Sequence, residues 1–243
     1  MQLSGAAEPS LRRSLPLTVR EVVVERMDAG GSARRILNRA SLLIEPGIVL
    51  AVTGPSGAGK TTLLHAIAGL VNPDHGTVSW GDRTITSLSE GERDRWRRNT
   101  VGLVFQDFQL VEELSVLENI LLPARFDHWR TPRALLERAI MLADRLGLDH
   151  RARRASALSR GEQQRVAIAR ALVREPRLIL ADEPTASLDS TNGERIAGLL
   201  IESARRTQAS ILLISHDSDV LRRADRVHQL VAGELGPALA ASS

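Results

Sequence analysis

Short apolar runs alternate with longer amphipathic stretches along most of this chain. Ile48–Val52 has no polar alternation, as expected of a strand that is buried on both faces. Further strands are predicted at Val22–Val24, Val101–Phe105, Leu178–Ala181 and Ile211–Ile214. Helical patterns separate them, at Lys60–Leu70 and around Ile196, Leu199 and Leu200. Buried strands that alternate with helices predict an α/β protein with a parallel sheet.

Residues 107–158 follow a different, more polar pattern. Ser115–Ile120, Arg133–Leu146 and Arg151–Ala157 favour helices, with Pro123 and Pro132 as expected breaks. We expect this block to be a helical insertion in the α/β core. Before Leu17 the chain mixes Gly, Ala, Ser, Pro and Arg without periodicity, and residues 1–16 are predicted to be a flexible tail.

Composition narrows the class of protein. The 243 residues are 43% hydrophobic and 25% charged, which fits one large folded domain. The absence of cysteine excludes disulfides and thiolate metal sites. We find no apolar run long enough to span a bilayer and no signal peptide, so any membrane role is expected to come through a partner. Aromatic residues are only 2% of the chain, which disfavours a surface that stacks nucleic-acid bases.

A glycine-rich loop after the Ile48–Val52 strand is the strongest chemical signal. Residues 54–61 read GPSGAGKT and fit the phosphate-loop pattern, in which backbone N–H groups and a helix N-terminus bind phosphate. Lys60, the only lysine of the chain, should reach the β- and γ-phosphates, and the Thr61 hydroxyl should bind Mg²⁺. The predicted nucleotide-binding residues are Gly54, Pro55, Ser56, Gly57, Ala58, Gly59, Lys60, Thr61 and Thr62.

Two further strands end in polar residues. Asp182 and Glu183 follow Leu178–Ala181, and His216 follows Ile211–Ile214. The carboxyl ends of parallel strands line the ligand crevice of an open sheet. Asp182 is therefore predicted to hold Mg²⁺, Glu183 to face an attacking water, and His216 to contact the γ-phosphate.

Ser159 and Glu162 form the S-x-x-E capping pattern before an alanine-rich helix. Taken alone, the pattern favours a well-capped helix start. The functional alternative is that this helix N-terminus faces a phosphate.

Together, these motifs resemble the ATP-binding-cassette (ABC) ATPases over residues 17–235. Residues 54–61 resemble the Walker A loop, Gln106 the Q-loop glutamine, residues 158–162 the signature motif, residues 178–183 the Walker B strand, residues 186–189 the D-loop and His216 the switch histidine. The resemblance implies a P-loop NTPase fold with a RecA-like parallel core (17–106 and 159–237), an N-terminal antiparallel β region, an inserted helical subdomain (107–158) and a tail at 238–243.

The resemblance also implies how the site works. Two copies would pack head to tail, with ATP held between Walker A of one copy and the signature of the other, Ser159, Arg160, Gly161 and Glu162. Glu183 would polarise the hydrolytic water, while Gln106 and His216 would sense the γ-phosphate. Thr61, Gln106 and Asp182 are the expected Mg²⁺ ligands, and Asp189 of the D-loop would couple the two sites.

The strings at residues 101–110, 118–123 and 161–171 look like those of lipoprotein-releasing and macrolide-exporting ATPases. This subfamily resemblance implies a separate integral membrane permease as partner and a cytoplasmic, peripheral position at the inner face of the membrane. No direct nucleic-acid partner is expected. Phe108, Leu110 and Val111 are candidate permease contacts, or simply subdomain core. The alternative function is a soluble ABC ATPase that acts on nucleic acid or in cluster assembly.

The chain departs from the family pattern at two places. Arg160 replaces the first glycine of the signature, and we expect the enzyme to remain active because Gly161 is kept. There is no tyrosine, and no aromatic residue before Trp80, where the family stacks the adenine ring. Arg26 is the predicted replacement, because a guanidinium plane can stack on a base. The alternative is that nothing stacks and base selectivity is relaxed.

Overall fold

The computed structural model describes residues 15–27, 31–126, 130–149, 154–186, 188 and 190–240. An antiparallel sheet forms the N-terminal part, in the order β2-β1-β4-β5. Its strands are β1 (Leu17–Met27), β2 (Ala33–Ile44), β4 (His75–Trp80) and β5 (Arg83–Thr84). The antiparallel N-terminal region predicted from the sequence is therefore confirmed.

A second sheet forms the centre of the molecule, in the order β10-β9-β3-β8-β7-β6. Its strands are β3 (Val49–Thr53), β6 (Val101–Val104), β7 (Leu178–Asp182), β8 (Ser210–Ile214), β9 (Arg226–Val231) and β10 (Glu234–Leu235), with β11 (Leu239–Ala240) paired to β9. The five strands from β9 to β6 run parallel. Every residue of β7 and β8 is buried, which explains why their sequences do not alternate.

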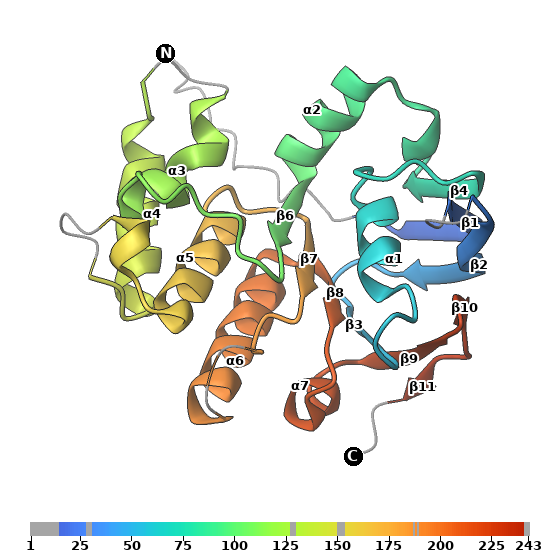
Figure 1. Cartoon of the computed structure of the whole chain (residues 1–243). Coiled ribbons are helices and arrows are strands. Elements are labelled where there is room, and N and C mark those ends of the chain that lie inside the picture. The colour runs from blue at the N-terminus through green and yellow to red at the C-terminus, as the bar shows by residue number, and fades with distance from the viewer. Residues whose placement is uncertain are drawn as a thin grey trace, which may run out of the picture.

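Two apolar cores lie on opposite faces of this central sheet. Alternate residues of one strand enter different cores: Ala51 packs with the helical block and with α6 (Ser190–Thr207), whereas Leu50 and Val52 pack with α1 (Lys60–Ile67) and the antiparallel sheet. Figure 1 shows α1 between the two sheets. The central strands are thus fixed from both faces.

The helical block consists of α3 (Val116–Arg125), α4 (Arg133–Arg145) and α5 (Arg160–Leu172). In Figure 1 it lies on the side of the molecule away from β1 and β2, and α5 packs against α3, α4 and β6. The helices expected between residues 107 and 158 are present as α3 and α4, and α5, which was predicted as part of the core, packs with them. The remaining helices are α2 (Glu90–Thr100), α7 (Ser218–Arg222) and the 3₁₀ turns Ile85–Ser87 and Ala155–Ala157. No helix within the described ranges is long and apolar enough to cross a bilayer.

Several local predictions differ from the structure. Pro123 does not break the chain but lies inside α3, and its carbonyl accepts a hydrogen bond from Arg174 Nη1 at 3.0 Å. The helix predicted over Arg151–Ala157 is a 3₁₀ turn at its C-terminal end, while residues 151–153 lie outside the described residues. Of the two predicted tails, residues 1–14 lie outside the described residues, and Leu239–Ala240 pair with β9 as a strand.

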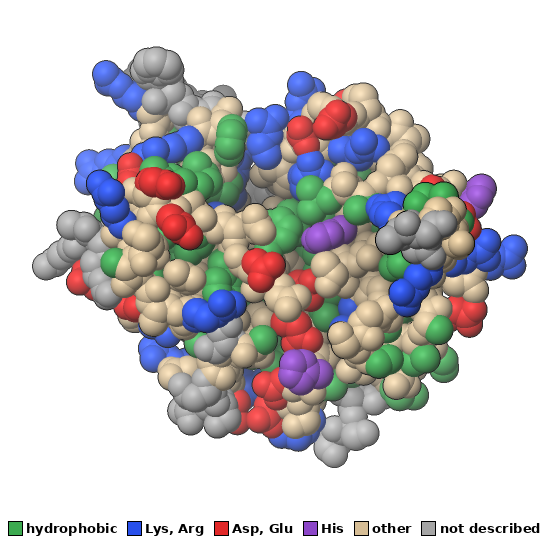
Figure 2. Space-filling model, in the orientation of Figure 1, with side chains coloured by type: hydrophobic (Ala, Val, Ile, Leu, Met, Phe, Trp, Pro, Cys, Tyr) green, Lys and Arg blue, Asp and Glu red, His purple; other side chains and the backbone are tan. Residues whose placement is uncertain are grey.

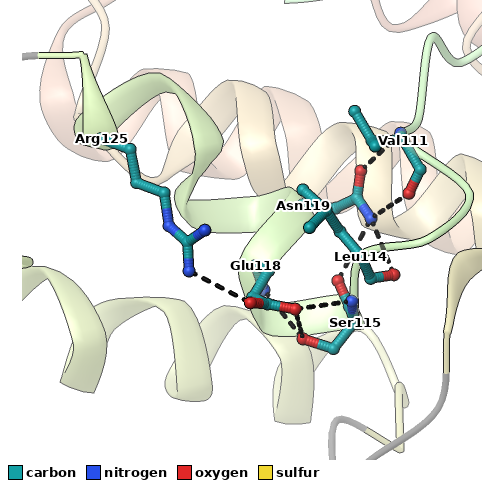
Figure 3. A network of polar contacts seen from close by, with 6 residues as sticks. All are labelled: Val111, Leu114, Ser115, Glu118, Asn119 and Arg125. Carbon is teal, nitrogen blue, oxygen red and sulfur yellow. Dashed lines mark hydrogen bonds and ion pairs between the residues drawn. The ribbon is translucent and has the colours of Figure 1, made fainter.

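A polar network fixes the segment that leads from Gln106 into α3 (Figure 3). Asn119 is fully buried; its Oδ1 accepts from the Val111 N–H at 2.9 Å, and its Nδ2 donates to the carbonyls of Val111, Leu114 and Ser115 at 3.0, 3.3 and 3.1 Å. Ser115 and Glu118 form a capping box at the start of α3. The Asn119 side chain therefore gives the Val111 N–H its acceptor and links three carbonyls of the turn to one another.

Candidate active site

The loop between β3 and α1 has a backbone that requires glycine. Gly54 has φ 150°, and a Cβ there would lie 2.1 Å from the carbonyl oxygen of Leu230. Gly59 has φ 102°, and its Cβ would lie 2.7 Å from the carbonyl oxygen of Ile36. Gly59 is also the N-cap of α1, so no side chain competes for the first N–H groups of that helix. The loop is built to bind an anion at the helix N-terminus.

The Lys60 ammonium lies across this loop. Its Nζ donates to the carbonyl oxygens of Gly54 at 2.8 Å and Pro55 at 3.0 Å. These bonds use two of the three donors of an ammonium group. Lys60 is therefore held beside the loop, where its third N–H can donate to a phosphate oxygen.

A hydroxyl and a carboxylate meet beside the loop. Thr61 Oγ1 donates to Asp182 Oδ2 at 2.7 Å, and Asp182 is only 3% exposed. Mg²⁺ prefers such oxygen ligands and usually takes one or two carboxylates, with phosphates and waters completing the octahedron. Among the residues that the structure describes, no group of three or more His, Cys, Asp or Glu side chains could hold a metal ion without phosphate or water ligands. Thr61 and Asp182 thus fit a Mg²⁺ ion that arrives with a nucleotide.

Glu183 and His216 meet at the ends of the neighbouring strands β7 and β8. His216 Nδ1 lies 2.9 Å from Glu183 Oε1, and the Glu183 side chain is 14% exposed, against 75% for His216. Glu183 has a left-handed backbone (φ 48°), an unfavourable conformation for a residue with a side chain. Its N–H donates to the Ile214 carbonyl at 3.0 Å, and Gln164 Nε2 donates to its carbonyl at 3.5 Å. Both bonds hold the backbone of Glu183 in this conformation.

One cavity of about 730 Å³ unites most of the predicted site. The predicted residues that line it are Gly54, Ser56, Gly57, Gly59, Lys60, Thr61, Thr62, Gln106, Asp182, Glu183 and His216. Pro55 and Ala58 do not line it; Pro55 accepts from Lys60, and Ala58 is buried. Ala186, the first residue of the predicted D-loop, also lines it, and two lining residues were not predicted: Arg34 and Ile36. No motif marks Arg34 or Ile36, because only the packing of β2 beside the loop brings them to the cavity.

The remaining predicted residues lie elsewhere. Ser159, Arg160, Gly161 and Glu162 form the start of α5 and do not line the cavity. The capping box predicted there is present: the Ser159 N–H and Oγ both donate to Glu162 Oε2 at 2.8 Å. Arg26 does not line the cavity either; its cross-strand partner Arg34 does. Asp189 lies outside the described residues.

This arrangement has the parts that phosphoanhydride hydrolysis needs. The glycine loop and Lys60 can bind a triphosphate, and Thr61 with Asp182 can hold the cation that neutralises it. Glu183 can accept a hydrogen bond or a proton from a water beyond the terminal phosphate. His216 orients that carboxylate through the bond at 2.9 Å.

Known proteins resemble the chain over nearly its whole length. The family model described as "ABC transporter" matches residues 37–186. An uncharacterized ABC transporter ATP-binding protein of Mycobacterium tuberculosis (strain ATCC 25618 / H37Rv) is 40% identical over 91% of this chain, which covers only 66% of that relative's length. The lipoprotein-releasing system ATP-binding protein LolD of Granulibacter bethesdensis is 39% identical over 90% of this chain and 95% of its own.

A solved structure supports the same grouping. The ATP-binding cassette MJ0796, determined as a dimer in a post-hydrolysis state bound to ADP and Pi, superposes with a TM-score of 0.86 at 32% identity. The match covers 93% of this chain and 99% of that one.

Proposed function

The chain belongs to the ABC transporter family, and on that premise we propose that it binds and hydrolyses ATP as a dimer that drives a separate membrane permease. The observation that carries this proposal is the single cavity lined by Lys60, Thr61, Gln106, Glu183 and His216. If each of these residues had only a structural role, nothing would require all five to line the same cavity. The cofactors are ATP and Mg²⁺.

Each residue of the cavity has a distinct role in the proposed reaction. The loop N–H groups and Lys60 hold the β- and γ-phosphates; Thr61, Asp182 and Gln106 would hold Mg²⁺, which would supply charge neutralisation on the phosphates. Glu183 orients a water in line with the bond between the γ-phosphorus and the β–γ bridging oxygen and accepts its proton. The bond to the bridging oxygen breaks as the water oxygen bonds to phosphorus, which gives ADP and phosphate.

The second copy supplies the donors that one chain does not bring to its own cavity. Exposed Ser159 and half-buried Gly161 lie at the start of α5, outside the cavity, and a helix N-terminus favours an anion. In a head-to-tail dimer, this end would face the γ-phosphate held by the partner, and Asp189 would couple the two sites. The dimeric state of the related cassette MJ0796 supports a dimer of this chain.

A groove beside the Gln106 segment supports a permease as the partner. It has a volume of about 480 Å³ and lies between α2, β6, α3 and α5. Its apolar lining includes Leu103, Phe105, Leu122, Pro123 and Phe126, and Phe126 is 70% exposed. A groove with an apolar lining and an exposed aromatic side chain favours a binding site.

Positive charge borders the same groove. Arg97, Arg98 and Arg174 line it, against the single acid Asp94, and Figure 2 shows basic side chains on both sides of the hollow between α3 and α2. We therefore assign the groove to an amphipathic cytoplasmic helix of the permease that carries acidic residues. Phe108 is buried and Leu110 packs on the core, so both fit the subdomain-core alternative, whereas Val111 is 37% exposed.

The work done by the complex is proposed to be export or the release of lipoproteins toward the periplasm. The similarity to proteins named as lipoprotein-releasing ATP-binding proteins, at 39–43% identity, supports this class. Such a complex would hold the chain at the cytoplasmic face of the membrane through its permease.

A pull-down tests the partner. Tagged Glu183→Gln chain, which should bind ATP without hydrolysing it, is incubated with detergent-solubilised membranes of the native host and Mg-ATP. We expect an integral membrane permease to copurify, and Phe126→Glu in the groove to abolish its capture. Leu239→Glu is the matched control, because Leu239 is 62% exposed but lies on β11. Capture of only soluble proteins or nucleic acid would instead support the soluble ABC ATPase.

A further inference from the structure

Arg160 lies where the family pattern has glycine, and its side chain contacts its own chain. Arg160 is the first residue of α5, and its guanidinium carbon lies 5.5 Å from the centre of the Phe108 ring. A guanidinium within about 6 Å of a ring face is attracted by the negative face of the ring. Arg160 is exposed, whereas Phe108 is only 5% exposed, so a solvent-exposed cation lies against a buried ring.

Phe108 belongs to the segment that directly follows Gln106. Phe108 and Gln109 both have left-handed backbones, with φ 57° and 50°, which is an unfavourable conformation for residues other than glycine. Two such residues in a row persist only when surrounding groups hold them. The segment is therefore a strained part of the chain next to a residue that lines the nucleotide cavity.

The same helix holds the backbone of this segment at its other end. Arg170 Nη1 donates to the Gln109 carbonyl at 2.5 Å, and Nη2 donates to the Phe108 carbonyl. Burial lowers the pKa of Arg170 to about 10, so its guanidinium stays charged at neutral pH. Arg170 holds the backbone and Arg160 lies against the ring, so α5 contacts the segment at two points.

We propose that Arg160 is a positioning residue that, through Phe108, couples the segment after Gln106 to the signature end of α5. When Gln106 responds to the γ-phosphate, the coupling moves Ser159 and Gly161 together with it. This inference rests on the proposed function, since only a head-to-tail dimer presents these residues to ATP. It differs from a role in which Arg160 pairs directly with the γ-phosphate of the partner's nucleotide.

A double-mutant cycle separates the two roles. Arg160→Met removes the charge but keeps most of the length, and Phe108→Leu removes the ring but keeps an apolar side chain. We expect each change to lower kcat about two- to fivefold, with KM for ATP unchanged. The double variant should be no slower than the slower single variant, and Arg160→Lys should recover part of the loss.

The opposite pattern would overturn the coupling. If Arg160 contacts the partner's γ-phosphate, then Arg160→Met raises KM, and its effect stays the same in the Phe108→Leu background. Arg160→Gly, which restores the usual family residue, should slow turnover as Arg160→Met does. A many-fold increase in turnover would contradict the proposal.

Amide hydrogen exchange tests the contact without relying on catalysis. The Phe108 and Gln109 N–H groups donate to the carbonyls of Phe105 and Asp107. We expect their exchange to be about two- to fivefold faster in Arg160→Met. Arg133→Met is the matched control, since Arg133 also opens a helix, α4. Unchanged exchange would refute the contact, whereas a chain that neither hydrolyses ATP nor dimerises with it would refute the proposed function.

Discussion

At the scale of single residues, the end of the cavity that β2 borders, beside the phosphate loop, has an unusual composition. The family stacks adenine on an aromatic ring, but this chain has no tyrosine and no aromatic residue between Leu15 and Trp80. Arg34 and Ile36, both on β2, line the cavity instead. A guanidinium can stack on any base, so this end should bind nucleotides with little preference among bases.

Substitution of Arg34 tests this account of the base contact. We expect Arg34→Ala to weaken ATP binding about two- to fivefold, and ATP and GTP to bind the unsubstituted chain with similar affinity, as measured by calorimetry. Arg26→Ala is the control on the neighbouring strand. If Arg26→Ala weakens binding and Arg34→Ala does not, the base contact is the one that the sequence predicts.

At the scale of elements, the start of α3 depends on one buried side chain. Asn119 makes four hydrogen bonds to the backbone of the preceding turn, and that turn follows the strained segment at Phe108. Without this side chain, the Val111 N–H loses its acceptor, whereas the Val111 carbonyl still accepts from the Leu114 N–H at 3.2 Å. A backbone N–H is costly when buried without a partner.

Truncation of Asn119 should therefore destabilise the fold. We expect Asn119→Ala to lower the free energy of unfolding by about 2–3 kcal/mol, measured by urea denaturation. Asn72→Ala, at an exposed asparagine, should change it by less than about 0.5 kcal/mol. Equal effects of the two changes would show that the network contributes little.

The contribution of the start of α3 to the stability of the fold depends on pH, and Glu118 determines the sign of that dependence. The Ser115 N–H, its hydroxyl and Arg125 lower the pKa of Glu118 below the ordinary 4.5. A carboxyl whose pKa is lower in the folded state stabilises the fold above its unfolded pKa, and this contribution is lost as pH falls through the folded pKa.

Thermal unfolding of the unsubstituted chain and of Glu118→Gln between about pH 6 and pH 3 measures this effect. We expect the Tm advantage of the unsubstituted chain to be largest at the upper end and to shrink below about pH 4.5. Parallel Tm curves would show that the capping box of α3 contributes no ionisation-linked stability.

At the scale of the whole molecule, local sequence patterns predicted the site residues that follow strands. They did not predict contacts between segments that are distant in the sequence. The phosphate loop, Asp182, Glu183 and His216 were predictable because each follows a buried parallel strand, and the carboxyl ends of such strands meet at one edge. Arg34 was not, because β2 reaches the cavity only through the packing of a second sheet.

Other errors have a similar cause. Pro123 lies inside α3 because tertiary contacts, such as the bond from Arg174 to its carbonyl, can override a local signal to break a helix. The contact between Arg160 and Phe108 joins residues 52 positions apart, as their numbers show, and no periodicity links them. Sequence patterns therefore located the chemistry of the cavity, while the structure was needed to find what positions it.

The central claim is that a second copy of this chain completes the ATP site. The most direct test is the mass of the purified Glu183→Gln variant, measured by light scattering with and without Mg-ATP. A chain of 26.5 kDa should double in mass with Mg-ATP and return to a single copy when ATP is removed. Gly161→Arg, at the start of α5, should prevent the change. A mass that stays at one copy at every ATP and protein concentration, or a dimer that forms equally well without ATP, would contradict the account.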